Sequence, residues 1–317
     1  MKEVGGYFEI EFSNIRLGKI HPDAIKLNTA RNCLEYILLA NNFRKIFIPY
    51  YTCDVILEPF IKHNLDYEFY HIDENFEPIK VPQCSLNEVF LYTNYFGIKD
   101  RFVEQLAGKI DNLIIDNSQA LFSPRINEVD TFYSLRKFVG VADGAFLYSK
   151  KKYDLAIEKA VSTNRVSHLY MRRDVDASSG YKMYKENDGA LVDLPMMEMS
   201  SSTKAFIETY DFEKNKAIRE RNFLFLHNEL SQINELEIDV SSVNGPLCYP
   251  FLKRNLKVKE ALINKKIYVP TYWSNVLDWI SNQECVEKHL VHDLMPLPID
   301  HRYDRRDFDL IKEVLMK

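Results

Sequence analysis

Apolar residues recur along the first half of the chain with two different spacings. Residues 32–41 place Cys33, Tyr36, Ile37 and Ala40 on one side of a helical turn, which predicts a helix. Residues 45–49 form a short apolar run ended by a proline, which is typical of a buried strand. The same two patterns continue to residue 148 and predict helices over residues 54–64 and 100–107, and strands over residues 67–72, 88–92, 112–116 and 145–148.

This alternation of strands and helices predicts an α/β fold. It implies βαβ units, and therefore a mostly parallel or mixed central sheet with helices on both faces. Ligands of such sheets bind outside the carboxyl ends of the strands. The segments to inspect for chemistry are therefore residues 49–54, 93–97 and 116–119.

The alternation weakens after residue 150. A long helix is predicted over residues 204–230, and the polar tract 172–188 is predicted to be a loop. Beyond it the pattern predicts strands at 236–240, 247–252 and 267–269, and helices at 258–264 and 307–316. This profile favours a large domain over residues 1–215 and a smaller C-terminal α+β domain over residues 216–317.

Charge and cysteine usage narrow the classes of function. A net charge of -5 over 317 residues argues against nucleic-acid binding. The basic clusters 172–173 and 302–306 adjoin aspartates, so we interpret them as solvated surface. No apolar segment is long enough for a signal core or a membrane span, so we expect no membrane partner. The five cysteines show neither CxxC nor Cys/His ligand spacing, which argues against a zinc site and disulfides and favours a cytoplasmic protein with no bound metal.

The most informative segment contains Asp116 and Lys137. Asp116 ends an apolar strand, where a carboxylate is costly unless a cation partners it. Lys137 follows another short apolar run, with Ser134 three residues before it. These are the parts of a pyridoxal 5'-phosphate (PLP) site: an amine that forms a Schiff base with the cofactor aldehyde, and a carboxylate that keeps the pyridine nitrogen protonated.

A place for the cofactor's phosphate precedes the first predicted helix. Asn28 or Thr29 can cap that helix, which leaves backbone N–H groups of Ala30 and Arg31 for an anion. The Arg31 guanidinium adds a fixed positive charge. Each of these residues alone has a commoner explanation, as a surface lysine or as a cap of a turn or helix. Their order and spacing together predict PLP binding.

The sequence resembles the DegT/DnrJ/StrS family of sugar aminotransferases, which are fold type I PLP enzymes. The matching segments are Thr29-Ala30-Arg31 at the phosphate loop, Ile48-Pro49-Tyr50-Tyr51-Thr52 after a strand, Asp116-Asn117-Ser118-Gln119-Ala120, Lys137-Phe138-Val139-Gly140, and Asp143-Gly144-Ala145. The resemblance implies a homodimeric enzyme that transfers an amino group, commonly from glutamate, to a keto-sugar or nucleotide-linked keto-sugar. Surface-polysaccharide or related sugar biosynthesis is the expected setting.

The resemblance also implies a role for each matching residue. Lys137 would hold the cofactor and move the proton, and Asp116 would pair with the pyridine nitrogen. Gln119 would lie near the cofactor's ring oxygen, and Ser134 would contact the phosphate together with the backbone of Ala30 and Arg31.

Three departures from the family pattern keep other functions open. Ala30-Arg31 replaces the usual Gly-Thr, and Cys53 occupies the position of the aromatic residue that stacks on the cofactor, which leaves either Tyr51 or no residue for that contact. The Gly-x-Asn-x-Arg segment that reaches the partner's phosphate is absent, and residues 192–202 are its nearest counterpart. A non-catalytic or regulatory relative is therefore one alternative. A PLP-dependent sugar dehydratase is another, although those members usually carry histidine at the position of Lys137.

Overall fold

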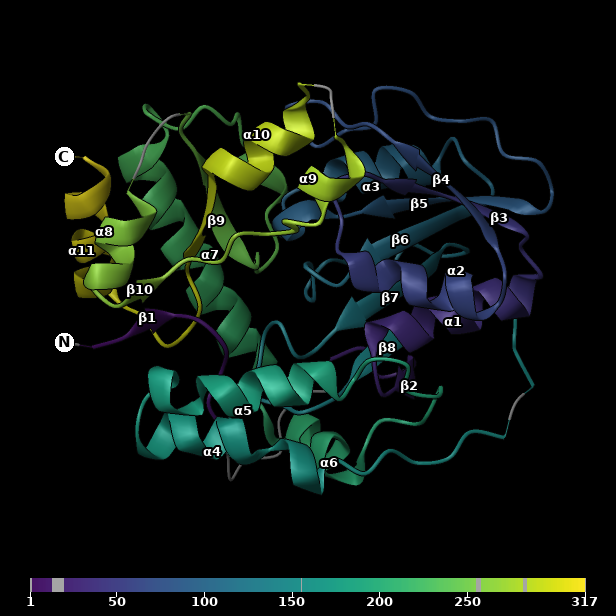
Figure 1. The fold of residues 1–317 in the computed structure, drawn as a ribbon, viewed down its shortest axis with the longest axis horizontal. Coiled ribbons are helices and arrows are strands. Elements are labelled where there is room, and N and C mark those ends of the chain that lie inside the picture. The colour runs from purple at the N-terminus through teal and green to yellow at the C-terminus, as the bar shows by residue number, and fades with distance from the viewer. Residues whose placement is uncertain (1, 13–19, 155, 255–257, 282–283, 317) are drawn as a thin grey trace.

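A seven-stranded sheet runs through the larger part of the molecule (Figure 1). The computed structural model describes residues 2–12, 20–154, 156–254, 258–281 and 284–316. In spatial order the strands are β2 (Ile25–Leu27), β8 (Ala145–Tyr148), β7 (Asp130–Ser134), β6 (Leu113–Asn117), β5 (Glu88–Thr93), β3 (Lys45–Pro49) and β4 (Asp66–Tyr70). Strand β8 runs in the opposite direction to the other strands of this sheet, which are parallel to one another. The expected α/β class with a mostly parallel sheet is confirmed.

Helices cover both faces of this sheet. Alternate residues of a strand point to opposite sides, and here both sides carry apolar residues that must be buried. On one face the strands pack against α3 (Asp100–Ala107), through Val103 and Leu106, in a cluster that includes Phe47, Phe90, Tyr92, Leu113 and Ile115. On the other face they pack against α1 (Ala30–Asn41) and α2 (Glu58–Lys62), which follows the short η1 (Asp54–Leu57), in a cluster that includes Ile46, Ile48, Leu91, Ile114 and Phe132. Helices on both faces are thus confirmed.

The C-terminal part has its own core. Strand β9 (Cys248–Leu252) pairs antiparallel with β11 (Leu294–Pro298), and this pair packs against the long helix α7 (Phe212–Leu230). The remaining described elements here are η4 (Val240–Ser242), α8 (Lys259–Asn264), β10 (Ile267–Tyr268), α9 (Val276–Trp279), α10 (Val286–Asp293) and α11 (Arg305–Leu315).

The first residues of the chain lie against this C-terminal part. Strand β1 (Val4–Gly5) pairs parallel with β10, so the N-terminal segment contacts residues 267–268 (Figure 1). The boundary near residue 215 stays a prediction. No helix within the described ranges is long and apolar enough to cross a bilayer.

Two predicted elements of the C-terminal half have a different form. The stretch 204–230 contains two helices, α6 (Ser201–Thr209) and α7, because Asp211 accepts a hydrogen bond from Lys214 N (2.9 Å) and caps a new helix. The strand predicted at 236–240 is absent from this described segment. Its alternating pattern reflects one buried side chain, that of Leu236, in an irregular segment along β9.

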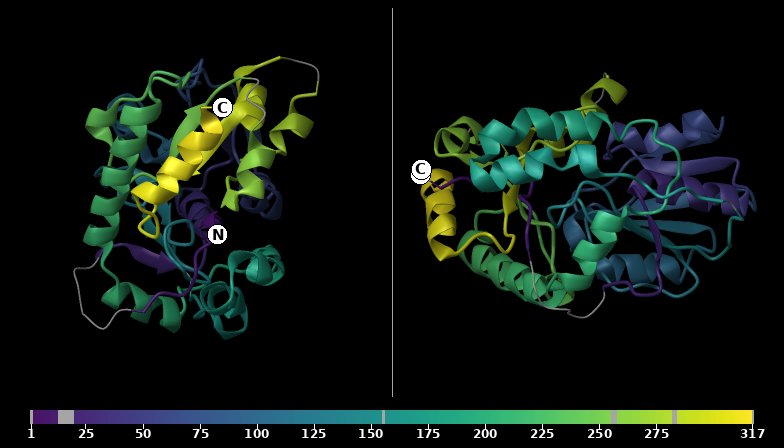
Figure 2. Two further views of the ribbon diagram at one scale, coloured as in Figure 1. Left: turned by 90° about the vertical axis from the view of Figure 1, so that its left-hand side faces the viewer. Right: turned by 90° about the horizontal axis from the view of Figure 1, so that it is seen from below.

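The polar tract 172–188 is helical, and the prediction of a loop there is wrong. It holds the end of α4 (Ser167–Asp174) and most of α5 (Ala177–Gly189), which pack side by side beneath the C-terminal part (Figures 1 and 2). Gly180 of α5 gives the Tyr7 ring room to pack, since a Cβ there would lie 2.1 Å from the Tyr7 hydroxyl. Asp176 caps α5 by accepting a hydrogen bond from Ser179 N (2.7 Å).

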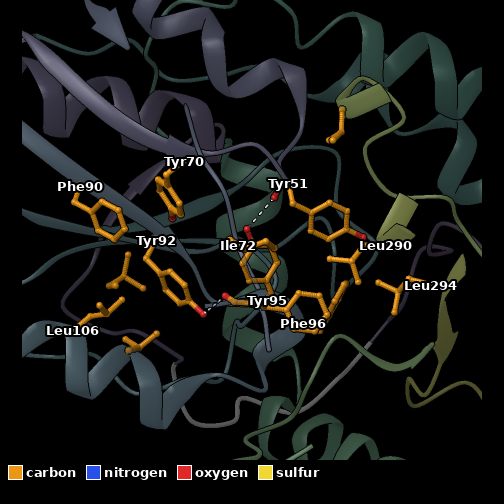
Figure 3. Close-up of a cluster of buried hydrophobic side chains, with 14 of the residues drawn as sticks. Tyr51, Tyr70, Ile72, Phe90, Tyr92, Tyr95, Phe96, Leu106, Leu290 and Leu294 are labelled. Atoms are coloured by element: carbon orange, nitrogen blue, oxygen red, sulfur yellow. Dashed lines mark hydrogen bonds between the residues drawn. The ribbon is translucent and has the colours of Figure 1, made fainter. Parts of the chain in front are cut away.

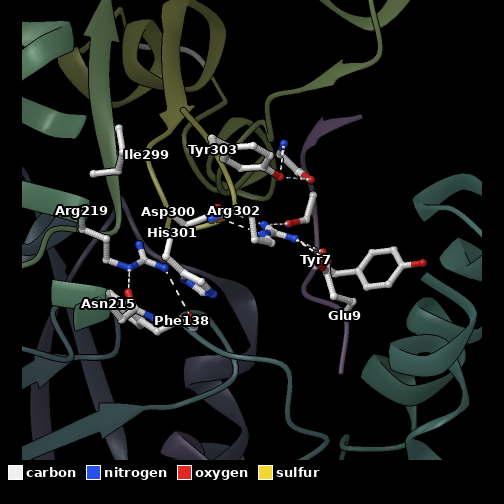
Figure 4. A network of polar contacts seen from close by, with 12 residues as sticks. Tyr7, Glu9, Phe138, Asn215, Arg219, Ile299, Asp300, His301, Arg302 and Tyr303 are labelled. Atoms are coloured by element: carbon white, nitrogen blue, oxygen red, sulfur yellow. Dashed lines mark hydrogen bonds and ion pairs between the residues drawn. The ribbon is translucent and has the colours of Figure 1, made fainter. Parts of the chain in front are cut away.

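Two arginines predicted to be solvated are largely covered: Arg172 is buried, and the side chain of Arg302 is 9% exposed. Arg172 is 8% exposed, and its guanidinium donates to the Gly5 carbonyl (2.9 Å) and approaches Glu9 (3.2 Å). Arg302 donates to the Tyr7 carbonyl (3.0 Å) and pairs with Asp300 (2.7 Å). The interpretation as surface is wrong for both, because they bind the N-terminal segment to the rest of the molecule. Figure 4 shows Arg302 beside Tyr7 and Glu9 of this segment.

The N-terminal segment also crosses the turn that carries Lys137. A Cβ on Gly140 would lie 1.8 Å from the Glu9 carbonyl oxygen, so only glycine fits. We expect Gly140→Ala to lower the free energy of unfolding by about 1–3 kcal/mol, because the segment must move away. Thermal unfolding measures this, with Gly189→Ala as the matched control, since a Cβ there meets nothing within 4 Å. Equal midpoints for the two variants would contradict the close approach.

Candidate functional site

The carboxyl ends of several strands meet at one edge of the sheet. Across β8, Ala145 is opposite both Leu27 of β2 and Ser134 of β7. In the next pairs, Asn117 is opposite Tyr133, and Asp116 is opposite Thr93. Three predicted site segments, at Thr29, Asp116 and Ser134, therefore follow or end strands along a single edge.

Lys137 lies in a tight turn directly after β7. Leu135 N donates to the Gly144 carbonyl (3.1 Å) and Val139 N to the Leu135 carbonyl (3.1 Å), which fixes the turn. The Lys137 side chain is half-buried, and its Nζ donates a hydrogen bond to Ser118 Oγ (3.2 Å). The lysine thus points back to the end of β6.

Asp116 is the buried carboxylate that faces this lysine. It is 7% exposed, and its Oδ1 accepts a hydrogen bond from Ser118 N (2.7 Å). Burial raises the pKa of the Asp116 carboxyl, whereas the nearby charge of Lys137 and the hydrogen bonds from Ser118 lower it. Ser118 therefore bridges the two predicted groups, a role that the sequence did not indicate.

Cys53 and Tyr51, which the sequence considered for the same contact, occupy different environments. Burial raises the pKa of the Cys53 thiol, and the charges of Lys137 and Asp116 also act on it, so Cys53 lies beside the pair. Tyr51 is fully buried in an aromatic cluster (Figure 3). Its ring meets that of Trp273 edge-on (4.6 Å between centroids).

Gln119 is buried beneath the same edge. Its Oε1 accepts a hydrogen bond from Phe96 N (3.1 Å), whereas its Nε2 has no partner among the described residues. Phe96 has a positive φ of 56°, a conformation that costs energy for an aromatic residue. The loop after β5 is therefore held in place against Gln119, with one amide N–H group left to donate.

The N-terminus of α1 opens toward this edge. Thr29 caps the helix: its Oγ1 accepts from Asn32 N (3.2 Å) and donates to Asn32 Oδ1 (2.7 Å). Ala30 and Arg31 form the first turn, which contains no acidic residue. The guanidinium of Arg31 is paired with Glu58 of α2, so its charge is already partly balanced. Thr29 as cap agrees with the sequence interpretation.

Further contacts, which the sequence did not indicate, support the Lys137 turn and α1. Asp143, 0% exposed, accepts hydrogen bonds from Ser200 N (2.8 Å) and Ser200 Oγ (2.7 Å), which connects the β7–β8 loop to α6. Gly144 N donates to the Asn28 carbonyl (2.7 Å), and Asn28 N donates to the Met197 carbonyl (2.9 Å). The segment 192–202, considered for contact with a partner subunit, thus lies against α1 of its own chain.

These residues fit PLP chemically. The half-buried amine of Lys137 lies beside the buried carboxylate of Asp116. Helix α1 begins at the same edge of the sheet, and its first turn contains no acidic residue. The unpaired Nε2 of Gln119 adds a donor suited to an oxygen of a ligand.

Comparison with known proteins identifies similar folds. No family model matches the chain, and no curated protein sequence matches it. A DegT/DnrJ/EryC1/StrS aminotransferase from Brucella abortus has a TM-score of 0.61 at 13% identity, covering 92% of this chain and 85% of its own. A sugar aminotransferase from Micromonospora echinospora also has a TM-score of 0.61, at 14% identity over 92% and 86% of the chains.

Dehydratases share this fold as well. GDP-4-keto-6-deoxy-D-mannose-3-dehydratase from E. coli, solved with bound hydrated PLP, has a TM-score of 0.60 at 13% identity, covering 92% of this chain and 87% of its own. At such identities the likeness shows the fold alone. The fold implied by the family resemblance is therefore confirmed, and the chemistry must be argued from the residues.

Proposed function

We propose that the chain is a PLP-dependent enzyme of the DegT/DnrJ/StrS type that transfers an amino group to a keto-sugar or nucleotide-linked keto-sugar. The observation that carries the proposal is the Lys137–Ser118–Asp116 arrangement at the carboxyl edge of the sheet. The fold, which it shares with solved sugar aminotransferases, supports the same function. A homodimer, glutamate as amino donor and a role in polysaccharide synthesis follow from the family resemblance and belong to the proposal.

Each residue has a defined task in this proposal. When bound, PLP supplies an electron sink that makes an amine's α-proton removable. Lys137 would bind the cofactor through Nζ and afterwards carry the proton on that atom. Asp116 would hold a proton on the pyridine nitrogen through a charge-assisted hydrogen bond. The first turn of α1, with Ser134, would bind the phosphate.

Three observations bear on the choice between the competing functions. The proposal favours transamination over dehydration because dehydratases of the family usually carry histidine at this position. Here the residue is Lys137, and its amine is directed at Ser118. A non-catalytic relative is favoured by Cys53, which offers no ring to stack on the cofactor, and by the pairing of Arg31 with Glu58.

The experiment is reconstitution with PLP. We expect a yellow absorbance band from protein-bound PLP. Borohydride should bleach this band and leave the cofactor permanently attached to Lys137, and glutamate should convert the unreduced cofactor to its aminated form. A colourless protein after incubation with PLP would overturn both enzyme functions. A band that no amino donor changes would overturn transamination alone.

Asp116→Asn should lower the rate of amino transfer by about two orders of magnitude or more, because the amide cannot hold the ring nitrogen in its protonated form. Single-turnover kinetics with glutamate measures the effect. Asp130→Asn is the matched control, because Asp130 is also buried in a strand. It lies at the start of β7, at the edge of the sheet away from Lys137, where it contacts Asn41 and Lys150. Full activity of Asp116→Asn would refute the role of this carboxylate.

A further inference from the structure

Glu287 is a carboxylate buried without a full set of partners. Glu287 lies at the start of α10 and is 0% exposed, yet its Oε2 has no hydrogen-bond partner among the described residues. Its Oε1 accepts from Ile72 N (2.8 Å) and lies 3.0 Å from His71 Nδ1. Burying a carboxylate costs several kcal/mol unless a positive charge compensates it, and a single half-exposed histidine gives only partial compensation.

Two metal-binding side chains lie beside this carboxylate. One ligand atom each of His71, Cys285 and Glu287 lies within 4.8 Å of the other two. His71 follows β4 of the large sheet, whereas Cys285 and Glu287 belong to the start of α10, more than 200 positions later. His71 and Cys285 are each half-buried, so the group is open to solvent on one side.

We propose that His71, Cys285 and Glu287 bind a zinc ion, with water completing its coordination. An imidazole nitrogen, a thiolate and a carboxylate form a ligand set that suits zinc. Coordination at roughly 2.0–2.3 Å requires the three atoms to move closer together, and the half-exposed side chains of His71 and Cys285 can rotate to do so. The ion would satisfy the unpaired Oε2 of Glu287 and balance its charge.

The position of the site assigns the ion a structural role. Ile72, whose N–H group binds Glu287, packs in the same hydrophobic cluster as Leu290 of α10 (Figure 3). Zinc would therefore fasten α10 to the edge of the large sheet. This role does not depend on Lys137 or on any cofactor.

Metal binding by the full chain tests the proposal. Protein stripped with a chelator and kept reduced is titrated with Zn²⁺ against a competing indicator dye, without PLP. We expect one zinc per chain, and an affinity at least about tenfold weaker in Cys285→Ser and in His71→Asn. Cobalt in place of zinc should give a thiolate-to-metal absorbance band that Cys285→Ser lacks.

Matched controls come from the same region. Cys84→Ser removes a half-buried cysteine of the same cluster, and His289→Asn removes a histidine of α10 that faces Glu284 and Asp293. Both should bind zinc like the unmodified chain. Equal zinc affinity in the unmodified chain and Cys285→Ser would overturn the proposal, as would a loss of binding in the controls. Either result would mean that His71, Cys285 and Glu287 form only a hydrogen-bonded contact.

Discussion

Replacing Lys137 with alanine should abolish amino transfer and leave the fold intact. The chemical loss is complete because no other amine is directed at Ser118 and Asp116 among the described residues. The loss in the free energy of unfolding is small, since the substitution removes one hydrogen bond of 3.2 Å, and such a bond contributes about 1 kcal/mol. Activity and thermal unfolding of the same preparation separate the two effects.

Two further variants show what the lysine contributes. Lys137→Arg keeps the positive charge but cannot bond covalently to an aldehyde, so it should also be inactive. Lys150→Ala, which removes a lysine that donates to the Asp111 carbonyl, should keep full activity. If Lys137→Arg retained activity, Lys137 would act only through its charge and the proposed function would fail.

Replacing Arg219 with methionine should cause a large loss of stability. Arg219 is 0% exposed, and its guanidinium donates to Asn215 Oδ1 (2.7 Å) and to the carbonyls of Pro246 (3.2 Å) and Phe138 (3.3 Å) (Figure 4). Methionine fills the volume but leaves these acceptors unpaired, which costs about 3–5 kcal/mol in total.

The charges around Arg219 support this expectation. Burial alone would raise the pKa of Asp300, but the charges of Arg302 and Arg219 outweigh it and hold that pKa well below its usual range. Without Arg219, Asp300 loses one of these charges. Arg221→Met is the matched control, because Arg221 is exposed on the same helix. Denaturant unfolding should show a large loss for Arg219→Met only, and equal losses would contradict the argument.

The sequence predicted the sheet because its strands carry strong local signals. Residues 45–49 and 145–148 match β3 and β8 fully, since short apolar runs that end at a proline or begin after a glycine have few alternatives as buried elements. The helices α4 and α5 were missed for the opposite reason. Their small and polar residues, such as Gly180, are explained only by a distant partner, Tyr7, which packs against them.

The candidate site was predictable in outline for a similar reason. Asp116 and Lys137 lie at strand ends, and the order of strands in a parallel sheet brings such ends together. What the sequence could not give are contacts between separate loops, such as that of Ser118 with Lys137 or of Asp143 with Ser200. The proposed zinc ligands belong to the same class, because their spacing along the chain matches no metal-binding pattern.

The pairing of β1 with β10 constrains how the chain reaches its final structure during synthesis. Gly5 N donates to Tyr303 Oη (2.7 Å), a contact between positions 298 residues apart. Tyr303 must therefore be synthesised and leave the ribosome before Gly5 can make this contact. Contacts of such long range form late and slow folding. Until they form, the segment that crosses Gly140 is held only by its contacts with α4, such as the hydrogen bond from Ile10 N to the Leu169 carbonyl (3.1 Å), so we expect its packing over the turn that carries Lys137 to be completed late.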